Sequence, residues 1–205
     1  MTKDCLRILL LLCTTLTLIS CGGATGSSGG TGNDGVTGTD ETSAEASRLS
    51  TVETELLSLI NDERQASGLP ALARDSGLDT IMLWHVTHMA TEHFLNHEDI
   101  NGRDANERVQ YYSGNISMRC SEIIQWWGGN ESGQVHYQGY YNSPRHHDAY
   151  MEQGIYNLGG AEDVGIAAMS GPGPKDSEYA EVSGSYTGLV ICDQGVTLDV
   201  DPFSE

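Results

Sequence analysis

The chain has 205 residues, and its 29 Asp and Glu residues outnumber its 10 Lys and Arg residues to give a formal net charge of −19. So acidic a chain is a poor candidate for binding nucleic acid or anionic lipid headgroups. Attraction to cations or basic partners is one interpretation of the charge, and solubility outside the cell is the simpler one.

The N-terminal segment has the pattern of a bacterial secretory signal. Lys3 and Arg7 form a short positive region, and an apolar or neutral run from Ile8 to Ile19 follows, with a small residue before Cys21. These last residues resemble a lipobox, in which the cysteine is lipidated and becomes the mature N-terminus. A membrane-spanning anchor is the weaker alternative, because the run is shorter than the ~20 residues that a spanning helix needs. We therefore predict a signal peptide over residues 1–20 and a cell-envelope protein that lipid on Cys21 holds to a membrane, facing the periplasm or the exterior.

The remaining chain divides by composition into three parts. Residues 21–48 are rich in Gly, Ser and Thr, which predicts a flexible linker. Residues 49–195 are long enough to form one domain with a core, and residues 196–205 are expected to be a solvated acidic tail. The domain contains Cys120 and Cys192. In an oxidising compartment these two are expected to form a disulfide, with two free buried thiols as the alternative.

Helical patterns open the domain. Ser50 begins a capping box, and apolar residues follow at helical spacing as far as a stop at Gly68. A second helix is predicted from Ser76 to about Phe94, and a short one over residues 105–111. His85 lies on the apolar stripe of the second helix, a position typical of a core histidine rather than of a ligand.

Strand patterns dominate the second half of the chain. Residues 118–127, 163–169 and 186–192 have the composition and alternation of strands, and the last two flank a Gly-Pro-Gly-Pro turn that predicts a hairpin with a long loop. Ser143 and Pro144 are typical of an N-cap and a first helical residue, while His136 is assigned to a loop. Helices that precede mostly antiparallel strands predict an α+β fold, with a sheet covered by helices.

A series of motifs over residues 53–192 resembles the CAP superfamily and its SCP-like domain. The matching elements are the opening helix as far as Leu72, the second helix with Met89 and Phe94 that ends near His97, the loop with Gly102 and Arg108, Ser121-Glu122-Ile123-Ile124, Tyr140 with Ser143-Pro144-Arg145-His146, and the strands Val164–Ala167 and Tyr186–Val190. Each motif is weak alone, and their shared order and spacing carry the resemblance.

The resemblance implies an α-β-α sandwich, with an antiparallel sheet between helices and a cleft whose floor carries two histidines and one or two acids. Carried across by position, the site residues are His97, Glu122 and His146, with Ser143 in place of the second acid. His97, Glu122 and His146 could hold a divalent metal such as zinc, calcium or magnesium. A hydrogen-bonded polar cluster without a tightly bound metal is the alternative.

Two classes of function stay open at this stage. The resemblance implies a scaffold used mainly for interaction, so we favour a monomeric, non-enzymatic module that binds a peptide, lipid or glycan. The alternative is a peptidase or esterase that uses a metal or a Ser143–His146–Glu122 arrangement, with His97 as a further catalytic candidate. An N-cap role argues against Ser143 as a nucleophile, because backbone N–H groups would occupy its hydroxyl.

Two adjacent tryptophans follow the glutamate of the predicted site. One of Trp126 and Trp127 is expected in the core, and the other could line the cleft. An aromatic wall there would suit a sugar, a lipid or a peptide.

Overall fold

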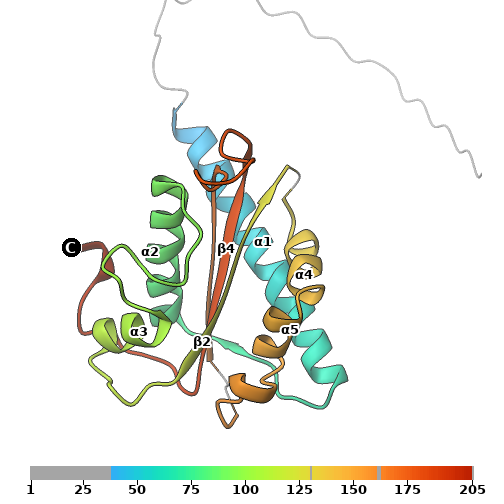
Figure 1. Cartoon of the computed structure of the whole chain (residues 1–205), viewed down its shortest axis with the longest axis vertical. Coiled ribbons are helices and arrows are strands. Elements are labelled where there is room, and N and C mark those ends of the chain that lie inside the picture. The colour runs from blue at the N-terminus through green and yellow to red at the C-terminus, as the bar shows by residue number, and fades with distance from the viewer. Residues whose placement is uncertain (1–37, 130, 161–162, 205) are drawn as a thin grey trace, which may run out of the picture. The chain divides into compact units, whose positions relative to one another are not determined.

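The computed structural model describes residues 38–129, 131–160 and 163–204 (Figure 1). The predicted signal peptide, the lipidation at Cys21 and the first part of the predicted linker lie outside the described residues. None of the described helices is both long and apolar enough to cross a membrane.

The first helix, α1 (Gly38–Ala66), begins inside the segment predicted to be a linker. Ser50 therefore lies within the helix instead of capping it, and its carbonyl accepts a hydrogen bond from the Thr54 hydroxyl at 2.9 Å. No Gly or Pro interrupts the sequence between Gly38 and Gly68, so nothing stops the helix from extending toward the N-terminus. Leu49 is already buried against β3, which shows that packing onto the domain begins in this part of α1.

The other elements follow in an order close to the predicted one. They are β1 (Ala73–Arg74), α2 (Ser76–Glu92), α3 (Ala105–Ser113), β2 (Cys120–Gly128), α4 (Gly133–Tyr141), α5 (Pro144–Tyr150), η1 (Gly154–Tyr156), β3 (Asp163–Pro172), β4 (Ser183–Cys192) and η2 (Pro202–Ser204).

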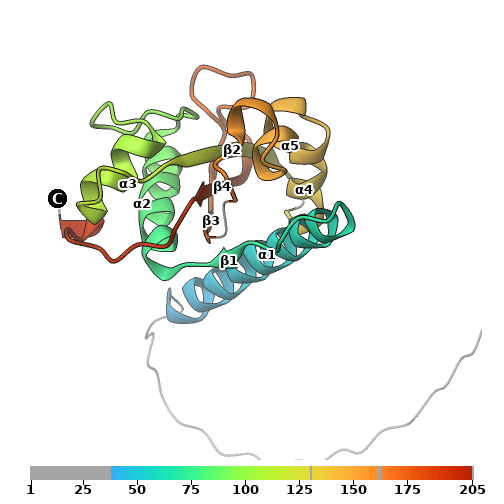
Figure 2. The same ribbon diagram turned by 90° about the horizontal axis from the view of Figure 1, so that it is seen from below.

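The strands form one sheet in the order β1-β3-β4-β2. β4 pairs antiparallel with β3, as the predicted hairpin requires, and also with β2. The two-residue β1 pairs parallel with β3, which makes the sheet mixed. Helices α2 and α3 cover one face, and α1, α4 and α5 cover the other (Figures 1 and 2). The predicted α+β fold and its α-β-α layers are confirmed. Cys120 lies opposite Cys192 in the β2–β4 register, and the predicted disulfide joins them.

Helix α4 was not predicted, and two glycines explain why. Gly133 and Gly139 are poor helix formers, yet each allows a close approach that any side chain would block. A Cβ on Gly133 would lie 2.4 Å from the backbone nitrogen of Leu56 in α1, and one on Gly139 would lie 2.3 Å from the Gln125 amide oxygen. His136 is consequently buried on a helix between α1 and the sheet, instead of lying in a loop.

The predicted solvated tail is wrong. Val196, Leu198 and Val200 are partly buried against the core cluster on the α2 face of the sheet, while the residues between them are exposed. The Asp199 amide donates to the Tyr112 carbonyl at 2.8 Å, which ties this segment to α3. Apolar residues at alternate positions let an acidic extended segment pack on one side and face water on the other. The domain therefore continues to residue 204.

Candidate functional site

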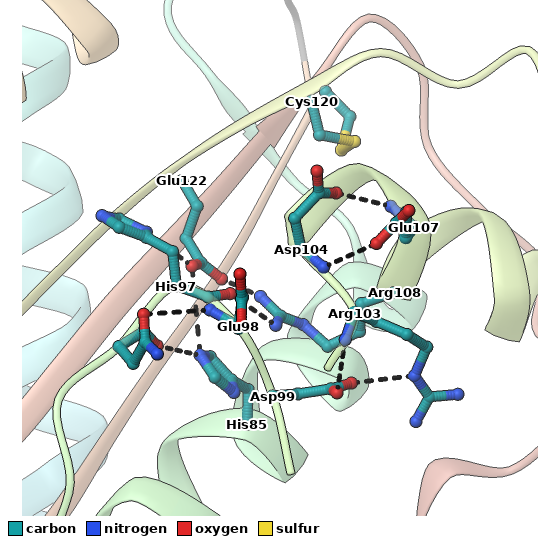
Figure 3. A network of polar contacts seen from close by, with 12 residues as sticks. His85, His97, Glu98, Asp99, Arg103, Asp104, Glu107, Arg108, Cys120 and Glu122 are labelled. Carbon is teal, nitrogen blue, oxygen red and sulfur yellow. Dashed lines mark hydrogen bonds and ion pairs between the residues drawn. A yellow bond between two sulfur atoms is a disulfide. The ribbon is translucent and has the colours of Figure 1, made fainter. Parts of the chain in front are cut away.

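The candidate site is centred on a buried carboxylate at the start of β2. The Glu122 side chain is 1% exposed, and its Oε1 accepts a hydrogen bond from Nδ1 of His97 at 2.9 Å. Its other oxygen, Oε2, accepts from Nη2 of Arg108, an equally buried guanidinium on α3 (Figure 3). The charge of Glu122 is thus balanced inside the protein, and both of its oxygens are engaged.

The start of α3 determines where Arg108 lies. Asp104 caps this helix by accepting from the Glu107 amide at 2.9 Å, and the Glu107 carboxylate accepts in return from the Asp104 amide at 3.1 Å. Arg108 follows one residue later, and its Nη1 also donates to the His97 carbonyl at 3.3 Å. One guanidinium therefore holds both the carboxylate and the backbone of the segment that carries His97.

His85 supports the same segment from α2. It is fully buried, as predicted for a core histidine, and its Nε2 lies 3.0 Å from the Asn96 carbonyl and 3.9 Å from Oε1 of Glu122. Burial, followed by the positive charge of Arg108, lowers the pKa of His85 to about 4. A neutral ring must donate from Nε2 to the Asn96 carbonyl, so His85 acts as a positioning residue for the loop before His97.

The contact with Glu122 also sets the tautomer of His97. A carboxylate only accepts hydrogen bonds, so Nδ1 of the His97 ring carries a proton, and in the neutral ring Nε2 presents a lone pair. The ring is 55% exposed, and Nε2 lies on its edge away from Glu122. A histidine held in this way can accept a proton or a hydrogen bond at Nε2.

His146 shares a cleft of about 440 Å³ with His97 and Glu122. Its ring meets the Tyr140 ring edge-on, with centroids 5.4 Å apart, and its Nδ1 is buried without a hydrogen-bond partner in the described part of the chain. Burial, and then the nearby His97, lower the pKa of His146, which favours the neutral ring. The structure thus brings together the three side chains that the resemblance had singled out.

Ser143 behaves differently from the prediction. It occupies the N-cap position of α5, but its side chain makes no capping hydrogen bond. Pro144 at the first helical position still favours a helix that begins there. Ser143 is also absent from the described lining of the cleft, and no hydrogen bond in the described structure joins it to His146.

The described arrangement does not fit a tight metal site. Among the described residues, no group of three or more His, Cys, Asp and Glu side chains is placed to hold a metal ion. A cation that approached Glu122 would meet the guanidinium of Arg108 on the same carboxylate, and like charges repel at this range. Metal binding by His97, Glu122 and His146 stays a prediction that requires Arg108 to move.

The two tryptophans lie outside this cleft. Trp126 and Trp127 line a separate cavity with the loop between β3 and β4. Trp127 lies five positions after Glu122 on an extended strand, a span of about 16 Å. That span explains why nearness in sequence did not bring the indole rings to the site.

A three-layer sandwich with an imidazole and carboxylate cleft is the architecture of a CAP-type domain. The family model described as "CAP: Cysteine-rich secretory protein family" matches residues 57–175, and the chain belongs to this family. No curated protein matches the chain in sequence.

Two solved structures share the fold. An outer surface protein from Borrelia burgdorferi is 17% identical with a TM-score of 0.50, and the match covers 69% of this chain and 90% of that one. An extracellular protein containing a SCP domain from Bacillus anthracis is 19% identical with a TM-score of 0.52, over 78% of this chain and 45% of that one. The match thus spans less than half of the Bacillus protein.

Proposed function

We propose that this CAP-domain protein is a binding module that works outside the cytoplasm, with the cleft between His97 and His146 as its binding site. One observation carries the proposal: the described lining of the cleft offers two imidazoles but no serine, threonine or free cysteine as a nucleophile. None of the described residues that line it is a serine or threonine, and its cysteine, Cys120, is in the disulfide. Such a cleft can exchange hydrogen bonds with a ligand but lacks a serine, threonine or free cysteine to attack one.

The other lining residues favour a polar ligand. Arg145, Asn106 and Tyr156 add a cation, an amide and a phenol to the two imidazoles. A peptide or a glycan offers matching donors and acceptors, so we place these ahead of a lipid chain at this cleft.

A hydrolase is the second candidate, and the His97–Glu122 contact is the observation in its favour. A histidine whose Nδ1 donates to a carboxylate is the arrangement of a general base, and Nε2 of His97 could take a proton from water. Such an enzyme would still need a metal ion to polarise the substrate or a serine to attack it. Among the described residues no side-chain group is placed to hold a metal ion, and Ser143 does not line the cleft.

Parallel binding and turnover assays on the full chain separate the two candidates. Binding of a tripeptide mixture and of chito-oligosaccharides is followed by saturation-transfer NMR, and turnover by p-nitrophenyl acetate and quenched fluorescent casein. We expect His97→Ala and His146→Ala to abolish the binding signal. His88→Ala is the matched control, because His88 lies outside this cleft with its Nδ1 2.8 Å from the Trp84 carbonyl. Turnover that His97→Ala or His146→Ala removes would favour the hydrolase instead.

The proposed location is the cell envelope, with a lipid on Cys21 as the anchor. The signal pattern before Cys21 and the Cys120–Cys192 disulfide support an oxidising compartment. The two similar structures are described as an outer surface protein and an extracellular protein, which agrees with this location. Cys21→Ala should move the protein from the membrane fraction to the soluble fraction and abolish labelling by radioactive palmitate. Retention in the membrane fraction would contradict the lipid anchor.

A further inference from the structure

A second cavity, of about 670 Å³, lies between the end of β2 and the loop that joins β3 to β4. Leu95, Trp127, Tyr179 and Val182 line it, and each of these side chains is 41–47% exposed. Large apolar side chains gathered around one hollow mark a binding surface more often than isolated ones do. Its described lining shares no residue with that of the His97 cleft.

The wall of this cavity is preformed by packed aromatic side chains. The Trp126 ring stacks on Tyr179 with centroids 5.7 Å apart and an angle of 29° between planes, and Nε1 of Trp126 donates to the Gly171 carbonyl at 3.4 Å. A Cβ on Gly128 would lie 2.8 Å from the indole, and one on Gly184 would lie 2.7 Å from it. Glycines on two paired strands thus leave the space in which the ring is held.

The cavity offers little to a polar ligand. No charged side chain lines it among the described residues. The Ser177 hydroxyl donates to the Pro174 carbonyl at 2.7 Å and accepts from the Tyr179 amide at 3.2 Å, so its hydrogen bonds are made within the loop. An aliphatic or aromatic side chain suits this lining better than a sugar does.

An acidic cavity of about 840 Å³ continues from the apolar one, and Leu95 and Pro174 line both. Glu92, Glu98 and Asp176 line the acidic part, and none of them has an ion-pair partner among the described residues. Lys175 is the single lysine or arginine of this lining among the described residues. We call the two parts together the Leu95 groove.

We infer that the Leu95 groove binds a basic peptide segment of a partner protein. An apolar side chain of the peptide occupies the apolar part of the groove beside Trp127, and a neighbouring Lys or Arg lies beside Glu98 and Asp176. Charge complementarity identifies the occupant, because free carboxylates adjoin an uncharged aromatic pocket. The same carboxylates repel anionic headgroups, which argues against a membrane surface. This site is independent of the proposed function of the His97 cleft.

Fluorescence anisotropy with three labelled peptides and the full chain tests the inference. The probe is Gly-Gly-Leu-Trp-Gly-Lys-Lys-Gly-Gly, and its matched controls replace Lys-Lys by Glu-Glu or Leu-Trp by Ala-Ala. We expect the probe to bind at low salt and each control peptide to bind about tenfold more weakly or not at all.

Variants of the chain then locate the binding. Trp127→Ala, and separately Val182→Ser, should weaken binding of the probe by about tenfold, as expected for anchor positions. Glu98→Gln combined with Asp176→Asn should weaken it and reduce its salt dependence. Ile116→Ala is the control, because Ile116 is 85% exposed and lines neither part of the groove.

Three results would overturn the inference. They are failure of the probe to bind, equal binding of the Glu-Glu peptide, and indifference of binding to both Trp127→Ala and Val182→Ser. Binding to phosphatidylcholine vesicles that Trp127→Ala removes, without binding of the probe, would assign the surface to a membrane instead. His146→Ala should leave binding of the probe intact, because His146 lines neither part of the groove, so failure of this site and failure of the cleft are distinguishable.

Discussion

Nδ1 of His97 lies 2.9 Å from Oε1 of Glu122, and this contact determines which edge of the imidazole meets the cleft. Arg108 holds the other oxygen of the same carboxylate and the backbone carbonyl of His97. The buried pair of Glu122 and Arg108 therefore orients His97 from two sides. A cleft built in this way presents a hydrogen-bond acceptor to a ligand instead of a bare carboxylate.

Removing Arg108 should destabilise the domain strongly. Arg108→Met leaves the buried Glu122 carboxylate without its cation, and the loss of one partner of a buried pair typically costs about 3–5 kcal/mol of the free energy of unfolding. Urea denaturation measures the change, and Arg145→Met at an exposed position is the control. The double variant Arg108→Met with Glu122→Gln should recover part of the loss. A loss below about 1 kcal/mol in Arg108→Met would place the pair in water instead of in the core.

Acid should destabilise the protein through two buried histidines. Burial is the main cause that lowers the pKa of both His85 and His136 to about 4 in the folded state, against an ordinary value of 6.5. The unfolded chain therefore binds more protons between these values, so this stability is present above pH 6.5 and is lost as the pH falls toward 4. From pH 7 to pH 5 we expect a loss of about 2 kcal/mol for each histidine.

The His136 part of that loss can be isolated by substitution. Nδ1 of His136 lies 2.9 Å from the Gln125 amide nitrogen, and Nε2 lies 2.8 Å from the Ser185 hydroxyl. Protonation of Nδ1 would therefore place its N–H group against the N–H donor of the Gln125 amide. His136→Gln should flatten the dependence of the unfolding free energy on pH, measured by urea denaturation at each pH. An unchanged slope would show that His136 does not titrate in this range.

The disulfide should contribute substantially to stability. Cys120 and Cys192 are 72 residues apart in the sequence, and closing a loop of this length restricts the unfolded chain. Replacing both cysteines by serine should lower the free energy of unfolding by about 4 kcal/mol in the chain-entropy model. Thermal unfolding with and without reductant gives a second measurement. Equal melting temperatures in the two conditions would contradict a disulfide in the folded protein.

The C-terminal segment should behave as part of the domain. Leu198→Asp places a charge among side chains that pack on the core, and we expect a loss of about 2 kcal/mol. Asp199→Asn is the matched control, because Asp199 is exposed between the packed residues and its backbone amide is unchanged. Urea denaturation measures both variants. Equal stability of Leu198→Asp and the control would indicate that the segment is solvated, as its composition suggested.

The layers of the fold were predictable because their patterns are local. The apolar stripe of α2, the alternation in β3 and β4 and the pair of cysteines each depend on neighbours in sequence or on composition. The start of α1 and the packed tail were missed because composition dominated the interpretation there. Small polar residues can still form a helix when a residue such as Leu49 packs on the domain. Acidic residues can likewise form a packed extended segment when a residue such as Leu198 contacts the core.

The candidate site was predictable only in part. The family resemblance identified His97, Glu122 and His146, and the structure brings them to one cleft. Arg108 was noted only as part of a motif, because no sequence pattern states which carboxylate a buried guanidinium will meet. The Leu95 groove was likewise missed, since it depends on how the β3–β4 loop folds over the end of β2.

The sharing of Glu122 between His97 and Arg108 is tested most directly by long-range proton–nitrogen correlation NMR on the chain labelled with ¹⁵N-histidine. We predict that the neutral ring of His97 carries its proton on Nδ1 and has an unprotonated Nε2, and that Glu122→Ala removes this preference. A neutral His97 ring protonated on Nε2 alone in the unsubstituted chain would contradict the described cleft, and with it the role of His97 as a hydrogen-bond acceptor for a ligand.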